Sequence, residues 1–127
     1  MESNELSNML SRIGAGLSEH RATFSALGDP SRQAILVELL NHYGGMRVNE
    51  IAKAVGLSRP ATSHHLKTLR EAGLADMYEK GTMNFYHACA SASEWQAIAL
   101  LAESVSQAAE AAAQRSEAEI ESTERSK

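Results

Sequence analysis

The sequence predicts a mainly α-helical protein with a small β-hairpin, a winged helix-turn-helix in the order α-α-α-α-β-β-α. Three observations carry this prediction. Apolar residues recur at helical spacing through most of the chain, one glycine turn separates two short helical segments, and a second glycine turn separates two short runs that contain aromatic residues. With 127 residues, the chain can bury a core of its own.

The N-terminal segment is predicted to form one amphipathic helix whose apolar face continues to Leu27. Its apolar residues are spaced by three and four positions, at Leu6, Met9, Ile13 and Leu17. A second helix begins at Asp29 and Pro30, which suit an N-cap and a first turn. It is apolar on most sides, which predicts a central place in the core. Arg32 is expected to form a structural ion pair, and residues 41–45 are expected to form a loop.

Two short helices then follow the pattern of a helix-turn-helix. Ala52 is the small residue where the two helices cross, and Gly56 can adopt the positive φ of the turn. Ser58 can cap the second helix, which runs to about residue 72. Two positions that are usually apolar hold Thr62 and His65, so we expect these side chains to be only partly buried.

The C-terminal part is predicted to contain a hairpin over residues 74–90 and a long helix. The hairpin turns at residues 79–82, and Ser93 caps a helix that starts near Glu94. Residues 1–115 are expected to form one domain with N- and C-terminal dimerisation helices, and residues 116–127 a charged, frayed tail.

Charge is unevenly distributed, although the formal net charge is −4 at pH 7. Between Arg47 and His87, six basic residues outnumber four acidic ones, whereas both flanking segments are net acidic. Local charge decides whether a surface meets phosphate, so the middle third is the candidate nucleic-acid surface.

Other features concern the cellular compartment. Cys89 is the single cysteine, and no CxxC motif or Cys/His cluster is present, which fits a reducing compartment. The N-terminus does not read as a signal peptide, and no apolar stretch approaches the ~18 residues of a membrane span. We therefore expect a soluble, cytoplasmic protein.

The second helix of the helix-turn-helix presents a face that suits DNA. No acidic residue lies between Val55 and Arg70. Arginine can bond guanine O6 and N7 together, which suits Arg59 to base readout beside His64, whereas lysine suits phosphate. With the hairpin as a wing, the predicted DNA-binding residues are Ser58, Arg59, Pro60, Ser63, His64, Lys67, Lys80 and Thr82.

The chain resembles the ArsR/SmtB-type winged-helix repressors over residues 26–87, in the stretches LGDPSRQAILVELL, NEIAKAVGLSRPATSHHLKTLREAGL and EKGTMNFYH. The resemblance implies a homodimer that binds an imperfect palindrome in double-stranded DNA. It also implies repression until an inducer weakens binding.

The sequence departs from the metal-sensing members of that family. Arg47 and Asn49 match the positions where those members carry a Cys-x-Cys pair, and residues 91–114 contain no His, Cys or Asp. We therefore expect a variant that senses no metal and has no cofactor, with an unknown small-molecule inducer. Two alternatives stay open, namely a thiol sensor at Cys89 and an unusual metal site built from His20, His42 and His87.

Two apolar stripes are available to pair subunits, because neither is needed to close the helix-turn-helix. The last helix carries a heptad-like seam, and the N-terminal helix carries the second stripe. The predicted dimer interface is Leu6, Met9, Ile13, Leu17, Trp95, Ile98, Ala102, Val105 and Ala109. The competing interpretation is that both stripes pack on their own subunit.

The predicted function is that of a sequence-specific transcription regulator that binds double-stranded DNA as a homodimeric repressor. The alternative is a winged-helix module that binds proteins and no DNA. An enzyme is not expected, because the sequence shows no nucleophile–base pair, phosphate loop or metal-ligand spacing.

Overall fold

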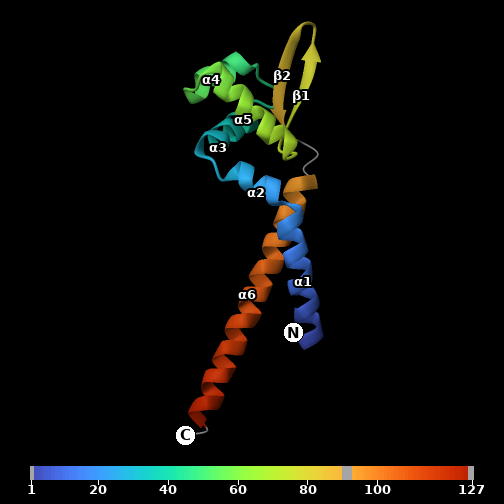
Figure 1. Cartoon of the computed structure of the whole chain (residues 1–127), viewed down its shortest axis with the longest axis vertical. Coiled ribbons are helices and arrows are strands. Elements are labelled where there is room, and N and C mark those ends of the chain that lie inside the picture. Colours follow the sequence, from blue (N-terminus) through green and yellow to red (C-terminus); the bar gives the residue numbers. More distant parts are fainter. Residues whose placement is uncertain (1, 90–92, 126–127) are drawn as a thin grey trace. The chain divides into compact units, whose positions relative to one another are not determined.

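The structure is a computed structural model that describes residues 2–89 and 93–125. The predicted fold class is confirmed, with helices throughout and one antiparallel hairpin (Figure 1). The elements are α1 (Ser3–Glu19), α2 (Arg21–Leu27), α3 (Pro30–Asn41), α4 (Val48–Val55), α5 (Arg59–Glu71), β1 (Ala75–Lys80), β2 (Met83–Ala88) and α6 (Ser93–Arg125). Within the described residues, none of the helices has the length and apolar character that a bilayer span requires.

These elements form two compact units. One consists of α1 and α6 from Trp95 onward, and the other covers His20–Glu94. The second unit contains the winged helix, and within the first the half-buried apolar residues of α1 pack on α6.

The first predicted helix is two helices, α1 and α2, which is a correction to the predicted element order. The break falls at His20, which has φ −100° and ψ 20°. The two helices bury different residues in different places: α2 buries Thr23 and Ala26, whereas α1 has no fully buried residue. A single straight helix would keep one apolar face throughout.

The core of the winged helix is built from α3, α4, α5 and Leu74, which lies between α5 and β1. Its largest fully buried apolar side chains are Ile35, Leu39, Ile51, Leu66, Leu69 and Leu74. The prediction that α3 has a central place in the core is confirmed, because Ile35 and Leu39 are fully buried, although Val37 and Leu40 are 64% and 63% exposed. Only one face of α3 meets α4 and α5, so its remaining apolar residues stay in solvent.

The turn between α4 and α5 has the predicted chemistry. Gly56 adopts φ +72° at the end of α4, and the Ser58 hydroxyl accepts a 3.2 Å hydrogen bond from the Ala61 amide. Thr62 is fully buried rather than half-buried. Its hydroxyl donates to the Ser58 carbonyl at 2.8 Å, which satisfies the polar group and allows complete burial.

The wing is a regular hairpin in which Lys80 pairs with Met83, so its turn has two residues. Hydrogen bonds also hold the hairpin to the segment that precedes α4. The Met46 and Tyr86 backbones exchange two hydrogen bonds of 2.8 and 2.7 Å, and the Tyr78 hydroxyl donates to the Gly44 carbonyl at 2.7 Å. The segment before α4 therefore pairs with β2 through an antiparallel bridge between Met46 and Tyr86.

In the other unit, α1 and α6 lie antiparallel (Figure 1). Leu6 lies beside Ala111, near the N-terminus of α1, whereas Gly16 approaches Leu101 so closely that a Cβ at Gly16 would lie 2.9 Å from its Cδ1. The helix α6 continues to Arg125, over residues for which the sequence predicted a frayed tail. Residues 116–125 include four glutamates, which are good helix formers.

Candidate nucleic-acid interface

The buried side of α5 determines which of its side chains face outward. Thr62, Leu66 and Leu69 are fully buried. By helical spacing, the opposite face carries the five residues predicted to meet DNA, and all of them are exposed: Arg59, Pro60, Ser63, His64 and Lys67. Ser58, Lys80 and Thr82, the other three predicted residues, are exposed as well.

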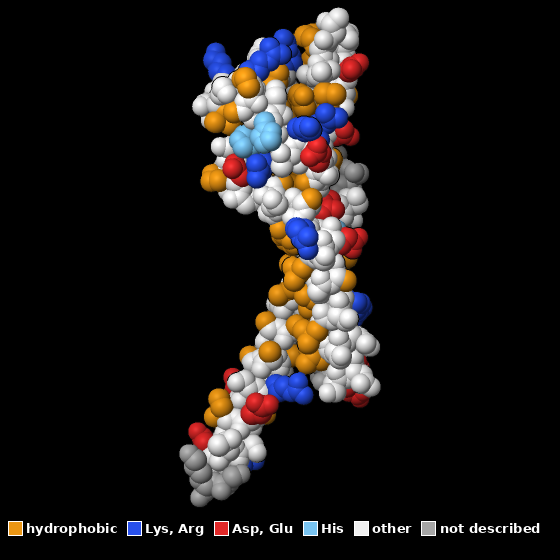
Figure 2. Space-filling model, viewed as in Figure 1, with side chains coloured by type: hydrophobic (Ala, Val, Ile, Leu, Met, Phe, Trp, Pro, Cys, Tyr) orange, Lys and Arg blue, Asp and Glu red, His pale blue; other side chains and the backbone are white. Residues whose placement is uncertain are grey.

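The outward face of α5 is basic and only weakly neutralised. Lys67 lies 4.0 Å from Glu71, in an exposed i,i+4 pair. Surface ion pairs of this kind contribute little to the free energy of folding, so Lys67 can bind another anion. His64 lies beside His65, with ring centroids 5.8 Å apart. Figure 2 shows Lys and Arg side chains gathered at the top of this unit, over α4 and beside the wing.

A polar groove of about 250 Å³ lies between α4, α5 and the wing. It brings together Arg59, Ser63 and Thr82 from the predicted set, but none of the other five predicted residues. The sequence did not assign Arg47, Asn49 or Asn84 to DNA, although all three line the groove. Arg47 belongs to the basic middle third of the chain, and that charge was the available signal.

Arg32, in the first turn of α3, connects the end of α2 to His65 of α5. Its guanidinium donates to the carbonyls of Ala26 and Ser25 at 2.8 and 3.2 Å, and lies 3.2 Å from Nδ1 of His65. A guanidinium only donates, so Nδ1 of His65 is the acceptor. Arg32 is thus structural, as predicted, but its hydrogen-bond partners are carbonyls and an imidazole rather than a carboxylate. His65 is half-buried, as expected.

A second polar cluster joins the start of α6 to α2. Oε1 of Glu94 accepts a 2.6 Å hydrogen bond from the Thr23 hydroxyl and lies 2.6 Å from Nδ1 of His20. The Thr23 hydroxyl also lies 3.4 Å from the carbonyl of Ala72, at the end of α5. The hydrogen bond from Thr23, together with His20, lowers the pKa of the Glu94 carboxyl. The sequence treated His20 as an isolated histidine and missed this cluster.

The groups considered for metal or thiol chemistry lie apart. Among residues 2–89 and 93–125, no cluster of three His, Cys, Asp or Glu side chains could hold a metal ion. His42 contacts Glu38 of its own helix, and His87 contacts the neighbouring Ala88 carbonyl. Burial, and then the charge of Asp76, raise the pKa of the Cys89 thiol. A raised pKa reduces the thiolate that reacts with oxidants.

The residues predicted for the dimer interface divide into two groups. Leu6, Met9 and Ile13 are half-buried, and each lies beside residues of α6 in its own chain. The predicted interface residues Ala102, Val105 and Ala109 of α6 are exposed. Leu17 is also exposed, and Trp95 and Ile98 are half-buried.

Comparisons with known proteins agree with this geometry. The model of the family described as "Bacterial regulatory protein, arsR family" matches residues 29–76. A helix-turn-helix transcriptional regulator of Methanocaldococcus jannaschii is 42% identical over 64 residues, which cover 50% of this chain and 71% of that protein. The transcriptional repressor SdpR of Bacillus subtilis is 38% identical over 63 residues, 50% of this chain and 68% of that protein.

A solved structure extends the similarity. The ArsR-like transcriptional regulator of Rhodococcus sp. RHA1 is 27% identical, with a TM-score of 0.64 over 81% of this chain and 93% of that one. The similarity therefore reaches beyond the segment that matches the family model.

Proposed function

Because the chain belongs to the arsR family of bacterial regulatory proteins, we propose that it represses transcription as a homodimer on an imperfect palindromic operator. That it is a DNA-binding transcriptional regulator with a winged helix-turn-helix fold follows from the family and the fold. The proposal adds the repressor role, the dimer, the palindrome and release by an inducer. Its relatives are transcriptional regulators, so neither an enzyme nor a module that binds only proteins is favoured.

The observation that carries the proposal is the outward face of α5. It offers a guanidinium at Arg59, hydrogen-bonding groups at Ser63 and His64, and an ammonium at Lys67, all in solvent. A helix of this kind fits the major groove of B-DNA, where such groups meet base edges and flanking phosphates. We propose Ser58, Pro60, Lys80 and Thr82 as further contacts, with the wing along the backbone.

Support for the dimer comes from exposed apolar residues on α1 and on α6. Leu10 and Leu17 are 52% and 47% exposed, and Val105 on α6 is 41% exposed. Ala102 and Ala109 flank Val105 on the same side of α6 by helical spacing. A second copy of this helix pair would cover these residues in a four-helix bundle. Leu10 was not in the predicted interface. Leu6, Met9 and Ile13, which were in it, are half-buried beside α6 of the same chain and remain part of the proposed interface.

We further propose that this regulator works in the cytoplasm and senses something other than a metal ion. Arg47 and Asn49 hold the positions that match the thiolate ligands of metal-sensing members, and neither side chain supplies a soft anionic ligand. The inducer that releases it from DNA is a small molecule.

The test is a fluorescence-anisotropy titration of the full chain on a duplex that carries the promoter of its own gene. The expected result is two chains per duplex, a preference over a scrambled duplex, and an affinity that falls steeply with salt. Equal affinity for both duplexes, or binding that does not depend on salt, would contradict the proposal.

A further inference from the structure

We propose that the groove between α4, α5 and the wing binds one phosphodiester of each operator half-site, held by Arg47 and Asn49, while Arg59 contributes its charge and reads a base. The inference rests on the proposed function, because it names a contact within the DNA-binding surface. It goes further by giving a binding role to the start of α4, which lies outside α5 and the tip of the wing.

The groove is lined by groups that donate hydrogen bonds. Among the described residues, no carboxylate lines it, and the side chains there that can form hydrogen bonds are Arg47, Asn49, Arg59, Ser63, Thr82, Asn84 and Tyr86. Each of these side chains has at least one N–H or O–H group to offer. A cavity of about 250 Å³ whose charged side chains are two guanidinium groups is suited to an anion.

Arg47 and Arg59 line the same groove, and neither guanidinium donates to an acceptor within the described part of the chain. The nearby Glu50 carboxylate is used by the backbone instead, since it accepts a 3.0 Å hydrogen bond from the Arg47 amide. Two unpaired like charges repel one another, so an anion held in the groove by Arg47 is attracted by both charges.

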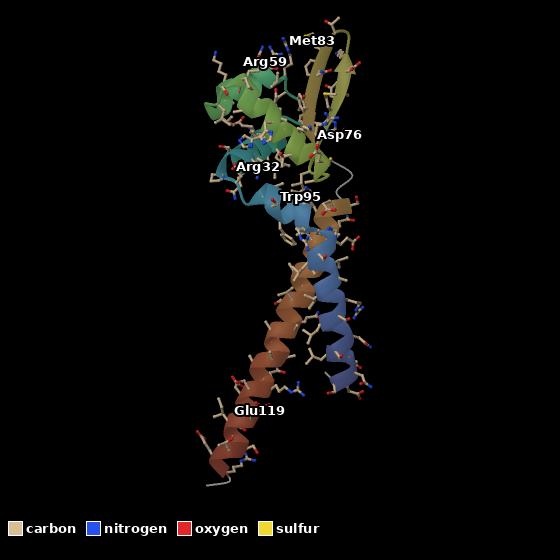
Figure 3. The ribbon with its side chains drawn as sticks, viewed as in Figure 1. Arg32, Arg59, Asp76, Met83, Trp95 and Glu119 are labelled. Atoms are coloured by element: carbon tan, nitrogen blue, oxygen red, sulfur yellow. The ribbon has the colours of Figure 1, made fainter. Side chains whose placement is uncertain are left out.

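Apolar groups in the groove favour a phosphodiester over a free phosphate ion. Met83 is 41% exposed and lines the groove beside Val48. Figure 3 shows Arg59 on α5 and Met83 on β2 at the same end of this unit. In a DNA strand, each phosphate is flanked by deoxyribose carbons that could cover such side chains, whereas an inorganic phosphate has none.

The experiment measures the full chain on operator and scrambled duplexes at several salt concentrations. Arg47→Ala is expected to weaken both complexes about tenfold, as loss of a charge-assisted hydrogen bond would. It should keep the preference for the operator and lower the slope of log affinity against log salt by about 1. The matched control is Lys53→Ala, which removes an exposed cation from α4 outside the groove and should change neither value.

A second measurement locates the phosphate without relying on a variant alone. Operator duplexes in which a single phosphate is replaced by a neutral methylphosphonate are bound to wild type and to Arg47→Ala. We expect one position per half-site at which neutralisation weakens wild type about tenfold but leaves Arg47→Ala unaffected. If wild type binds the operator but no position shows this loss, the groove inference is overturned while the proposed function stands. If wild type binds no duplex, the proposed function fails first.

The third arm distinguishes the two sources of phosphate. Inorganic phosphate is added to the wild-type complex and compared with chloride at equal ionic strength. We expect both salts to release DNA equally, because the groove fits a phosphate within a strand. Stronger release by phosphate from wild type, but not from Arg47→Ala, would show a free-anion site and overturn the assignment to a phosphodiester.

Discussion

The Thr23 hydroxyl donates a 2.6 Å hydrogen bond to Oε1 of Glu94, across 71 positions of sequence. Thr23 is almost fully buried in α2, and Glu94 stands in the first turn of α6. The bond therefore ties the beginning of the last helix to the core of the winged helix.

Glu94→Gln is expected to weaken the acid sensitivity of folding. The pKa of Glu94 is lowered in the folded chain by the Thr23 hydrogen bond and by His20. Its contribution to stability is therefore complete above the unfolded value, about 4.3, and disappears as pH falls through the lowered folded value. Urea unfolding between pH 6 and pH 3 should show a shallower loss of stability for Glu94→Gln than for wild type. The exposed Glu110→Gln serves as the control, and an identical slope for Glu94→Gln would contradict the assignment.

Arg59→Ala and Lys67→Ala should affect DNA binding differently. Loss of Arg59 should cost about 1–3 kcal/mol and relax the preference at one base pair per half-site. Loss of Lys67 should weaken all duplexes alike and reduce the salt slope by about 1. Anisotropy titrations on operators with single base-pair changes separate the two effects. Arg12→Ala, in α1, is the control, and wild-type affinity in both variants would show that the face of α5 is wrongly assigned.

Ala109→Glu is expected to produce monomers. The exposed stripe of Ala102, Val105 and Ala109 carries no charge, and a buried carboxylate without a partner is costly at a subunit interface. Sedimentation velocity should show a shift from dimer to monomer, with a large loss of operator affinity. Gln107→Glu introduces the same group two residues away, on the other side of the helix, and should remain a dimer. A dimeric Ala109→Glu would place the interface elsewhere.

Cys89 is expected to be a poor redox sensor. Burial raises the pKa of its thiol, and Asp76 adds to this effect, so little thiolate is present at neutral pH. Its reaction with a chromogenic disulfide at pH 7 should be slower in the folded chain than in urea. Peroxide should leave operator binding intact in wild type and in Cys89→Ala alike. Release of wild type, but not of Cys89→Ala, would establish a sensing role.

Zinc, cadmium and arsenite are expected not to release the operator at one equivalent per subunit. Arg47 and Asn49 offer no thiolate, and residues 91–114 offer no His, Cys or Asp. The measurement is anisotropy of the preformed complex, with chelator-treated protein as the reference. Tight binding of one metal per subunit that dissociates the complex would contradict this prediction.

Local patterns predicted those elements whose causes are local. Asp29 accepts the Arg32 amide at 3.1 Å, and Ser58 accepts the Ala61 amide at 3.2 Å, so two of the three expected caps are present. The third expectation was wrong, because Ser93 is the first residue of α6 rather than its cap. Gly56 has the positive φ that the turn requires. Each of these features depends on residues within a few positions of one another, which a sequence displays directly.

Features that depend on distant residues were missed. The anion groove joins Arg47, Arg59 and Asn84, and no periodicity links those positions. The helix α6 carries two neighbouring apolar stripes, one through Leu101 and Ala108 and the other through Ala102 and Ala109. Only the tertiary structure shows that α1 covers the first stripe. The exposure of Val37 and Leu40 on α3 was missed for the same reason, because an apolar residue type does not reveal whether the side chain is buried.

The two-residue turn of the wing restricts how this protein can change in evolution. Lys80 and Met83 are already paired, so a longer wing requires residues added to both strands together. One added pair lengthens the hairpin by about 3.3 Å but transfers every side chain beyond it to the opposite face. An insertion of four residues preserves the faces and an insertion of one disrupts the ladder. Wing lengths among descendants of this chain should therefore differ in multiples of four residues, unless a bulge absorbs the difference.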